Sequence, residues 1–291
     1  KNDVIGYYRV KPTTIKYVDF YEEEKFEWKT FPANKTSALK FAFRMGLKRV
    51  GLWLRTIRAP FLTATFAPVF IGSSVAWHDL KVNNLLNEWS WSMFWIVLFG
   101  ASLAQIATNS SNDYFDHTSS ADEINKVASP FNGGSRVIQV GLMTPGQVLL
   151  TALVSIAGTI LIGLYINQQI SGEFFGNTPI LWAGIIGTFL ALGYTGDPIR
   201  LGYKGLGEIA IAIGFGPVMV MGSHYALTVS LHNNDLSSWN WIEALIASVP
   251  IGILVMLIVW INQFQDAPSD AAVGKNTWVV KTAVNDGWMR L

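Results

Sequence analysis

Long apolar segments alternate with short polar segments from about residue 57 to the end of the chain. A helix that crosses a bilayer needs about 20 predominantly apolar residues. Six segments come close to this length, and a seventh begins near Thr277 and is cut off by the last residue, Leu291. The six are Pro60–Trp77, Trp91–Thr108, Val148–Asn167, Pro179–Thr195, Glu208–Val229 and Ile242–Ile261. This pattern predicts an all-α integral membrane protein.

The first 56 residues follow a different pattern. Residues 1–35 mix aromatic and charged side chains and contain no span, so we expect a polar, cytoplasmic N-terminal arm that forms a small cap or docks a protein partner. In residues 36–56 apolar side chains are interspersed with Lys and Arg, which suits an amphipathic helix at the membrane interface. A solvated helix that leads into the membrane fits this segment equally well. Residues 57–291 form the expected transmembrane domain.

The composition agrees with a membrane protein and excludes several other classes. Hydrophobic residues make up 51% of the chain and charged residues only 14%, which is unusual for a soluble domain. The 12 Trp suit aromatic belts at the two membrane interfaces. Because the chain has no Cys, disulfides and thiolate metal sites are excluded. The net charge of +1 is not gathered into a basic patch, so we expect no nucleic-acid partner.

Lys and Arg are distributed unevenly between alternate loops. The loops at residues 168–178 and 230–241 contain neither, and the loop after the first span contains only Lys81. The alternate loops and the segment before the first span carry Lys40, Arg44, Lys48, Arg49, Arg55, Arg58, Lys126, Arg136, Arg200, Lys204, Lys275 and Lys281. By the positive-inside rule, the N-terminus and these alternate loops are expected to be cytoplasmic.

The second apolar segment leads into an acidic motif, Asn112-Asp113-Tyr-Phe-Asp116, which continues to Asp122. On a helix, side chains three or four residues apart share a face, so Asn112, Asp113 and Asp116 can face one point. Carboxylate and amide oxygens are ligands that Mg²⁺ takes, with its remaining positions left for water and phosphate oxygens. Asp122 lies in a polar loop, where contact with water is the simpler interpretation. The motif predicts a metal site beside the bilayer.

A second motif, at the end of the sixth apolar segment, repeats this chemistry. Asn262, Asp266 and Asp270 step by four, and Lys275 supplies a point charge for a phosphate. Pro268 lies between the two aspartates, so the helix either ends near Asp266 or kinks, which makes Asp270 the least secure ligand. Either motif alone is more simply a helix cap or a turn. Two of them on one side of the membrane, at similar spacing, indicate a shared functional site.

The remaining candidates carry less specific signals. Arg200 and Lys204, between the fourth and fifth spans, either bind phosphate or anchor the orientation in the membrane. The stretch 133–136, Gly-Gly-Ser-Arg, resembles a backbone turn that approaches an anion. Three histidines have no partners at metal-ligand spacing and are expected to be incidental: His117, His224 and His232.

Together these motifs resemble the UbiA superfamily of intramembrane aromatic prenyltransferases. The resemblance rests on the first motif, the stretch 133–136, the segment Tyr194-Thr…Pro198…Tyr203-Lys-Gly-Leu-Gly-Glu208, and the second motif with Gly274-Lys275…Thr277. It runs from about Arg55 to the last residue. Within the superfamily, the chain is most similar to the 1,4-dihydroxy-2-naphthoate polyprenyltransferases of the menaquinone pathway.

The resemblance implies a bundle of nine transmembrane helices around a central cavity, of which this chain covers about seven. It also implies two Mg²⁺ that hold a polyprenyl diphosphate, and transfer of the prenyl group to an aromatic acceptor, with decarboxylation of a naphthoate. The expected metal ligands are Asn112, Asp113, Asp116, Asp122, Asp266 and Asp270. The expected catalytic residues are Asp113, Asp116 and Asp266. The expected substrate-binding residues are Asn112, Arg136, Tyr194, Arg200, Lys204, Asn262 and Lys275.

Other functions stay open at this point. The chain could belong to another UbiA branch, which prenylates 4-hydroxybenzoate, chlorophyll or tocopherol precursors, or archaeal ether lipids. It could be a UbiA-fold subunit with a structural role in a larger membrane complex. A site without catalytic function, however, would not be expected to retain so many acidic residues, which are costly to place beside a bilayer. A carrier or channel is the third alternative, but its ionisable groups are expected at mid-span rather than at the span ends.

Overall fold

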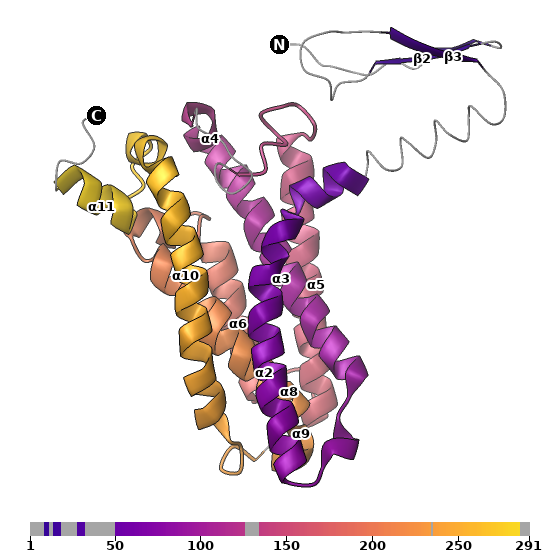
Figure 1. Cartoon of the computed structure of the whole chain (residues 1–291), viewed down its shortest axis with the longest axis vertical. Coiled ribbons are helices and arrows are strands. Elements are labelled where there is room, and N and C mark those ends of the chain that lie inside the picture. Colours follow the sequence, from indigo (N-terminus) through magenta and orange to yellow (C-terminus); the bar gives the residue numbers. More distant parts are fainter. Residues whose placement is uncertain are drawn as a thin grey trace. The chain divides into compact units, whose positions relative to one another are not determined.

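The six apolar segments form helices that lie side by side as a bundle (Figure 1). They are α2 (Thr63–Val82), α3 (Trp91–Thr118), α5 (Pro145–Ser171), α6 (Pro179–Gly193), the segment Gly207–Leu227 and α10 (Trp241–Ala272). The segment Gly207–Leu227 comprises α7 (Gly207–Ile213), a π-helical turn (Gly214–Val218) and α8 (Met219–Leu227). Five of the six are long and apolar enough to cross a membrane, whereas α6, with 15 residues, is shorter. The prediction of an all-α membrane fold is confirmed for the helical part of the chain.

The described part of this region also contains three short α-helices, α4 (Ala121–Ile124), α9 (Val229–His232) and α11 (Trp278–Asn285). Short 3-10 helices lie at Ala59–Leu62, Leu86–Glu88 and Leu201–Lys204. The computed structural model describes residues 9–11, 14–18, 28–32, 50–125, 134–233 and 235–285. Within these residues, α11 begins where the sequence pattern predicts the start of a seventh apolar segment.

The chain separates into two units, Lys1–Arg55 and Thr56–Leu291. In the first unit, β1 (Arg9–Lys11), β2 (Thr14–Val18) and β3 (Trp28–Pro32) form an antiparallel sheet in that order. Thr14 pairs with Lys11 on one side and with Pro32 on the other. The sequence pattern does not predict this sheet, because its strands are short and mix charged with aromatic residues. Residues 50–56 are helical, and the rest of the segment 36–56 lies outside the described residues.

Polar side chains explain where several helices begin. Thr144 starts α5 with a capping box, in which its Oγ1 accepts from the backbone N of Gln147 at 3.3 Å and Gln147 Oε1 accepts from the backbone N of Thr144 at 2.9 Å. Ser90 and Thr178 cap the first turns of α3 and α6 in the simpler way, with a side-chain oxygen as acceptor. These caps satisfy backbone N–H groups that a helix leaves without internal partners at its start.

The two helices that carry the acidic motifs extend well beyond the predicted spans. α3 continues from Thr108 to Thr118, and α10 continues from Ile261 to Ala272. Of the two expectations for Pro268, a helix end near Asp266 is wrong, because α10 passes through the proline. A proline this close to the helix end removes one backbone hydrogen bond, and contacts of α10 with α4 and α11 hold its last turns in place.

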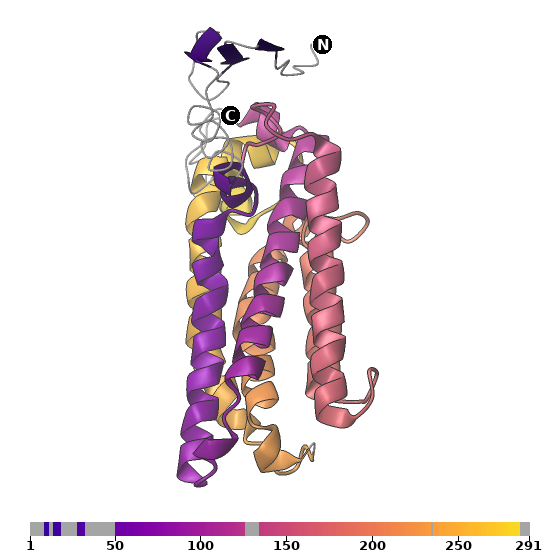
Figure 2. The same ribbon diagram turned by 90° about the vertical axis from the view of Figure 1, so that its right-hand side faces the viewer.

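Small residues let the helices pack closely. α3 lies along α5, as Figure 2 shows, and α2 lies along α8. A Cβ on Gly72 of α2 would collide with the carbonyl oxygen of Val220 in α8. A Cβ on Gly252 of α10 would lie 2.5 Å from the carbonyl oxygen of Ala212 in α7. Glycine therefore permits backbone contact at both crossings, as is common between membrane helices.

The main apolar core lies toward the end of the bundle where α3 begins. It contains Val69, Ala76, Phe94, Val97, Leu98, Ile166, Ile180, Tyr225, Ala226 and Leu227. A polar cluster of Asp79, His224 and Trp239 lies at the same end. We call it the opposite cluster, because it lies at the other end of the bundle from the last turns of α3 and α10. Asp79 and His224 are buried, at 6% and 0% exposure.

Directed hydrogen bonds link the members of the opposite cluster. Trp239 Nε1 lies 3.0 Å from His224 Nδ1, and an indole N–H can only donate, so Nδ1 is the acceptor. His224 Nε2 then carries the proton that Asp79 Oδ2 accepts at 2.9 Å. Asn240 Nδ2 donates to the same oxygen at 3.4 Å. His224 therefore joins α2, α8 and the segment before α10, which is a structural role that sequence spacing does not indicate.

Candidate active site

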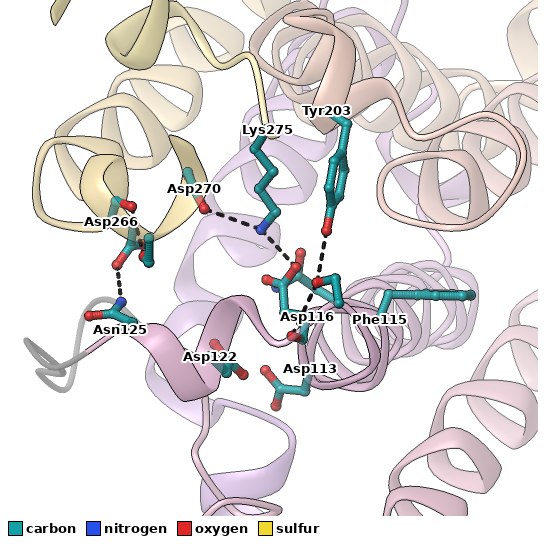
Figure 3. Close-up of polar contacts among 12 residues, drawn as sticks. Asp113, Phe115, Asp116, Asp122, Asn125, Tyr203, Asp266, Asp270 and Lys275 are labelled. Carbon is teal, nitrogen blue, oxygen red and sulfur yellow. Dashed lines mark hydrogen bonds and ion pairs between the residues drawn. The ribbon is translucent and has the colours of Figure 1, made fainter. Parts of the chain in front are cut away.

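Five aspartates come together at the end of the bundle where α3 and α10 finish (Figure 3). Asp113 and Asp116 come from α3, Asp122 from α4, and Asp266 and Asp270 from α10. We call these five residues the aspartate cluster, and this end of the bundle the acidic end. All except Asp266 are buried. The structure thus brings the two predicted motifs together.

Lys275 lies between the two motifs. Its Nζ is 2.7 Å from Asp116 Oδ1 and 3.4 Å from Asp270 Oδ1 (Figure 3). The contact between Lys275 Nζ and Asp116 Oδ1 is an ion pair whose angles do not meet hydrogen-bond criteria. Asn112 Nδ2 donates to the second oxygen of Asp116 at 2.9 Å. Burial lowers the pKa of Lys275, but the Asp116 and Asp270 carboxylates outweigh this effect and raise the pKa, so the ammonium stays charged.

Arg58, just before the first span, occupies a second position among the aspartates. Its Nη2 pairs with Asp113 Oδ1, to which the backbone N of Ser135 also donates, at 3.2 Å. Gly134 has a φ of +75°, and a Cβ there would lie 2.9 Å from Asp113 Oδ1, 3.1 Å from Asp122 Oδ2 and 3.2 Å from Arg58 Nη2. Two carboxylates and a guanidinium therefore meet against a backbone that has no room for a side chain.

Asp266 has a partner from the segment after α4. Asn125 Nδ2 donates to Asp266 Oδ1 at 2.7 Å (Figure 3). The guanidinium of Arg136 donates to the backbone carbonyl oxygens of Asp122 and Asn125. Gln139 Nε2 donates to Asp122 Oδ2 at 3.3 Å. In this conformation Arg136 therefore fixes the loop that carries Asp122, and it does not line the cavity beside the aspartates.

Among the described residues, the cations that pair with these carboxylates are Arg58 and Lys275, so carboxylates outnumber their described cationic partners. Burial, reinforced by the Asp116 and Asp113 carboxylates, raises the pKa of Asp122 to about 8. Asp113 Oδ2 is buried without a hydrogen-bond partner, and Asp116 Oδ1 has the Lys275 ammonium as its ion-pair partner. Such oxygens suit a hard divalent cation, so the residues present fit Mg²⁺. Among the described residues, however, no three carboxylates or imidazoles converge on one point in this conformation.

Four of the five aspartates line a cavity, and Asp113 does not. The lining includes Arg58, Asn112, Asp116, Asp122, Asn262, Asp266, Asp270 and Lys275. A second, mostly apolar cavity runs between α3, α5, α6 and the segment Gly207–Leu227. Gln105, Thr108, Tyr194, Ile211 and Phe215 line both cavities, so the two adjoin. The far end of the apolar cavity reaches the main core, at Val97, Ile166 and Ile180.

Two of the expected substrate-binding cations lie outside both cavities. Arg200 Nε is 2.6 Å from Asp197 Oδ1, and the Arg200 side chain is 38% exposed. Its guanidinium lies over the ring of Tyr203, 5.0 Å from the ring centroid. Lys204 is exposed on the same loop. Tyr203 reaches toward the aspartates instead, and its hydroxyl donates to Ser119 Oγ at 3.0 Å (Figure 3).

Arg58 and Asn125 belong to this site, and the sequence pattern assigns a site role to neither. Arg58 ends a run of cations that the positive-inside rule explains without any binding role. Its position directly beside the first span is the one signal that could have distinguished it. Asn125 lies 141 residues from Asp266 in the chain, in a polar loop, and no local pattern connects the two.

Comparisons with known proteins agree with this geometry. The UbiA prenyltransferase family matches residues 58–288. The chain is 29% identical to 2-carboxy-1,4-naphthoquinone phytyltransferase of Synechocystis sp., over 81% of this chain and 67% of the relative. It is 32% identical to 1,4-dihydroxy-2-naphthoate octaprenyltransferase of Bacillus subtilis, over 79% of this chain and 65% of the relative.

The protein of the same name from Escherichia coli is 28% identical, over 81% of this chain and 70% of the relative. The chain therefore spans about two thirds of the length of these relatives. No solved structure is significantly similar to the chain.

Proposed function

Because this chain belongs to the UbiA prenyltransferase family, we propose that it transfers a polyprenyl group from a polyprenyl diphosphate to 1,4-dihydroxy-2-naphthoate. The names of the three relatives share a naphthalene-derived acceptor and differ in the prenyl group, which is phytyl in one and octaprenyl in two. They support a bicyclic acceptor in menaquinone synthesis.

The observation that carries this proposal is the junction of an acidic cavity with an apolar one. A prenyl diphosphate has a charged head and a long hydrocarbon tail, and the two cavities offer a matching surface to each part. Glycines line the apolar cavity on several helices and leave room for the tail: Gly100, Gly163, Gly184, Gly187, Gly214 and Gly222. The reacting carbon then lies at the junction, beside Tyr194 and Phe215.

The aromatic, apolar and charged groups of the site contribute differently to the reaction. The bond between the allylic carbon and the diphosphate breaks, a carbon–carbon bond forms to the acceptor ring, and the carboxyl group of the naphthoate leaves as CO₂. The aromatic faces of Tyr194 and Phe215 stabilise positive charge on the allylic carbon, and the apolar walls keep water away from it. Arg58 and Lys275 attract the diphosphate. The aspartate cluster would hold Mg²⁺, which would supply positive charge to stabilise the departing diphosphate.

The bundle is that of an integral membrane protein. We propose further that the acidic end faces the cytoplasm, since the loops at this end carry the Lys and Arg residues that the positive-inside rule associates with that side. Nothing in the described residues favours a protein partner for the N-terminal arm, and the proposal includes none.

Competition between acceptors tests the proposed function. The purified full chain in lipid nanodiscs receives a radiolabelled polyprenyl diphosphate, Mg²⁺ and either 1,4-dihydroxy-2-naphthoate, 4-hydroxybenzoate or homogentisate. We expect labelled lipid product and CO₂ release with the naphthoate, and at least about tenfold less product with the other two. An Asp266→Ala variant gives the background. Preferential prenylation of 4-hydroxybenzoate or homogentisate would replace the proposed acceptor, and no product with any acceptor would contradict the activity.

A further inference from the structure

Two side-chain cations stand among the aspartates that are expected to hold metal. We propose that Arg58 and Lys275 are exchangeable internal counterions, each of which pairs with buried aspartates and moves to the diphosphate when metal and substrate bind together. The inference rests on the proposed function, because it assigns a second position for these two cations in that same site. It makes metal binding and diphosphate binding cooperative.

Lys275 pairs with two aspartates. Its ammonium lies within 3.4 Å of carboxylate oxygens from both α3 and α10, at Asp116 and Asp270. A divalent cation that bridges these two carboxylates would enter the same space, and like charges at this separation repel strongly in a buried site. The backbone N of Lys275 is fixed to the carbonyl oxygen of Asp270 at 2.8 Å. Movement therefore involves the flexible side chain alone, which can swing to a neighbouring anion.

Arg58 pairs directly with one aspartate and lies near a second. Its Nη2 contacts Asp113, and Asp122 lies across the same small space beside Gly134. Arg58 has a φ of 50°, in the left-handed region that a non-glycine residue adopts only when its surroundings hold it there. Its Nε is buried without a hydrogen-bond partner, although the residue lines the cavity. The guanidinium is thus only partly satisfied by Asp113 and has donor capacity left for a diphosphate.

The positions of the two cations explain why the described carboxylates do not converge in this conformation. Arg58 and Lys275 occupy positions beside these carboxylates, so a metal ion that binds alone must displace a charged side chain that is tethered to the site. Diphosphate provides another partner for that side chain. Because the coupling between two ligands is reciprocal, diphosphate raises the affinity for metal by the same factor as metal raises the affinity for diphosphate.

Lys275→Met tests this exchange, because methionine keeps the length of the side chain and removes the charge. Mn²⁺ serves as the probe, and its binding to the full chain in nanodiscs is followed by electron paramagnetic resonance, with and without inorganic pyrophosphate. A metal buffer fixes free Mn²⁺, so chelation by pyrophosphate affects all variants equally. Lys204→Met is the matched control, since Lys204 is an exposed lysine outside the cavity.

We expect pyrophosphate to raise the Mn²⁺ affinity of the unmodified protein at least about tenfold. Lys275→Met should bind Mn²⁺ alone at least about fivefold more tightly than the unmodified protein and lose most of the pyrophosphate effect. Lys204→Met should change neither value. If Lys275→Met does not fold, Arg58→Gln is measured in its place. We expect this variant also to bind Mn²⁺ alone more tightly than the unmodified protein and to lose most of the pyrophosphate effect.

The outcomes separate the two proposals. If the unmodified protein binds Mn²⁺ but the variants bind it equally or more weakly without pyrophosphate, the cations are fixed elements of the site and the exchange is wrong. If the unmodified protein has no saturable Mn²⁺ site, with or without pyrophosphate, the metal-dependent function itself is contradicted.

Discussion

The bundle buries carboxylates at both of its ends, but the two clusters are built differently. In the opposite cluster, Asp79 receives directed hydrogen bonds from His224 and Asn240, and Trp239 completes the arrangement. At the acidic end of the described structure, Arg58 and Lys275 pair with three of the five aspartates, and the buried Oδ2 of Asp113 has no hydrogen-bond partner. Buried polar atoms in native proteins are normally paired, so an unpaired oxygen calls for an explanation.

The difference separates a structural cluster from a binding site. A cluster whose donors and acceptors match holds helices together and gains nothing from a ligand. A cluster with surplus negative charge becomes more stable when cations enter. Both ends bury ionisable groups, so burial alone does not show which end binds a ligand. The match between hydrogen-bond donors and acceptors differs between the two ends, and it identifies the acidic end as the binding site.

Removal of one carboxylate charge at each end is the strongest way to break this comparison. Asp113→Asn should lower prenyl transfer by more than about 100-fold, since changes even in the partners of metal ligands cost about 10–100-fold. Asp79→Asn removes the same charge from a site of similar burial and should leave transfer per folded molecule within about threefold of the unmodified protein. The comparison fails if Asp79→Asn loses as much activity as Asp113→Asn while the protein stays folded.

Gly134→Ala adds a single methyl group to the acidic end. The new Cβ would meet Asp113, Asp122 and Arg58, and we expect about a tenfold or larger loss of transfer from the displaced carboxylates. Gly141→Ala is the matched control, because Gly141 has a similar φ of +70° but no atom within 4 Å of its Cβ position. Both variants carry the same backbone strain, so only a difference between their rates reports on the site. Equal losses would mean that strain alone is responsible.

His224→Ala probes the opposite cluster through stability. The substitution leaves the buried Asp79 carboxylate without its main donor, which should cost about 1–3 kcal/mol of unfolding free energy. Thermal unfolding of the protein in detergent measures the loss, and transfer at a permissive temperature should stay nearly unchanged. His78→Ala, on the exposed side of the same region of α2, should have a midpoint close to that of the unmodified protein. An active-site role for the opposite cluster would instead appear as lost turnover without lost stability.

Arg200→Gln should have the smallest effect. Arg200 is partly exposed, pairs with Asp197 and lies outside both cavities, and exposed ion pairs contribute about 0–1 kcal/mol. The KM for the polyprenyl diphosphate should rise by no more than about threefold, and Lys204→Gln should behave in the same way. A rise of about tenfold or more for Arg200→Gln would return it to the set of diphosphate ligands, as the sequence pattern first suggests.

Much of the bundle could be predicted from the sequence, because apolar length alone reports on membrane spans. The helix ends could not, since hydropathy measures only the part in lipid. The polar turns that carry Asp113 and Asp270 continue α3 and α10 beyond that part. The sheet formed by β1, β2 and β3 was missed for a related reason, because strands of three to five residues have too few positions to show an alternating pattern.

The candidate site shows a similar limit. The spacing of four between Asn112 and Asp116 correctly predicts that their side chains meet. The same helical argument places Asp113 with them, whereas Asp113 turns instead to Arg58 and the backbone of Ser135. Tertiary contacts decide which aspartates share a cation, and contacts across 55 or more residues of sequence leave no local pattern.

Metal dependence tests the central claim most directly, because the account explains the surplus charge of the acidic end by divalent cations. Prenyl transfer is measured on one preparation in excess EDTA and again after Mg²⁺ is restored, with the opposite cluster intact throughout. We predict a loss of more than about 100-fold in EDTA and recovery with Mg²⁺. Full turnover in excess EDTA would contradict the account.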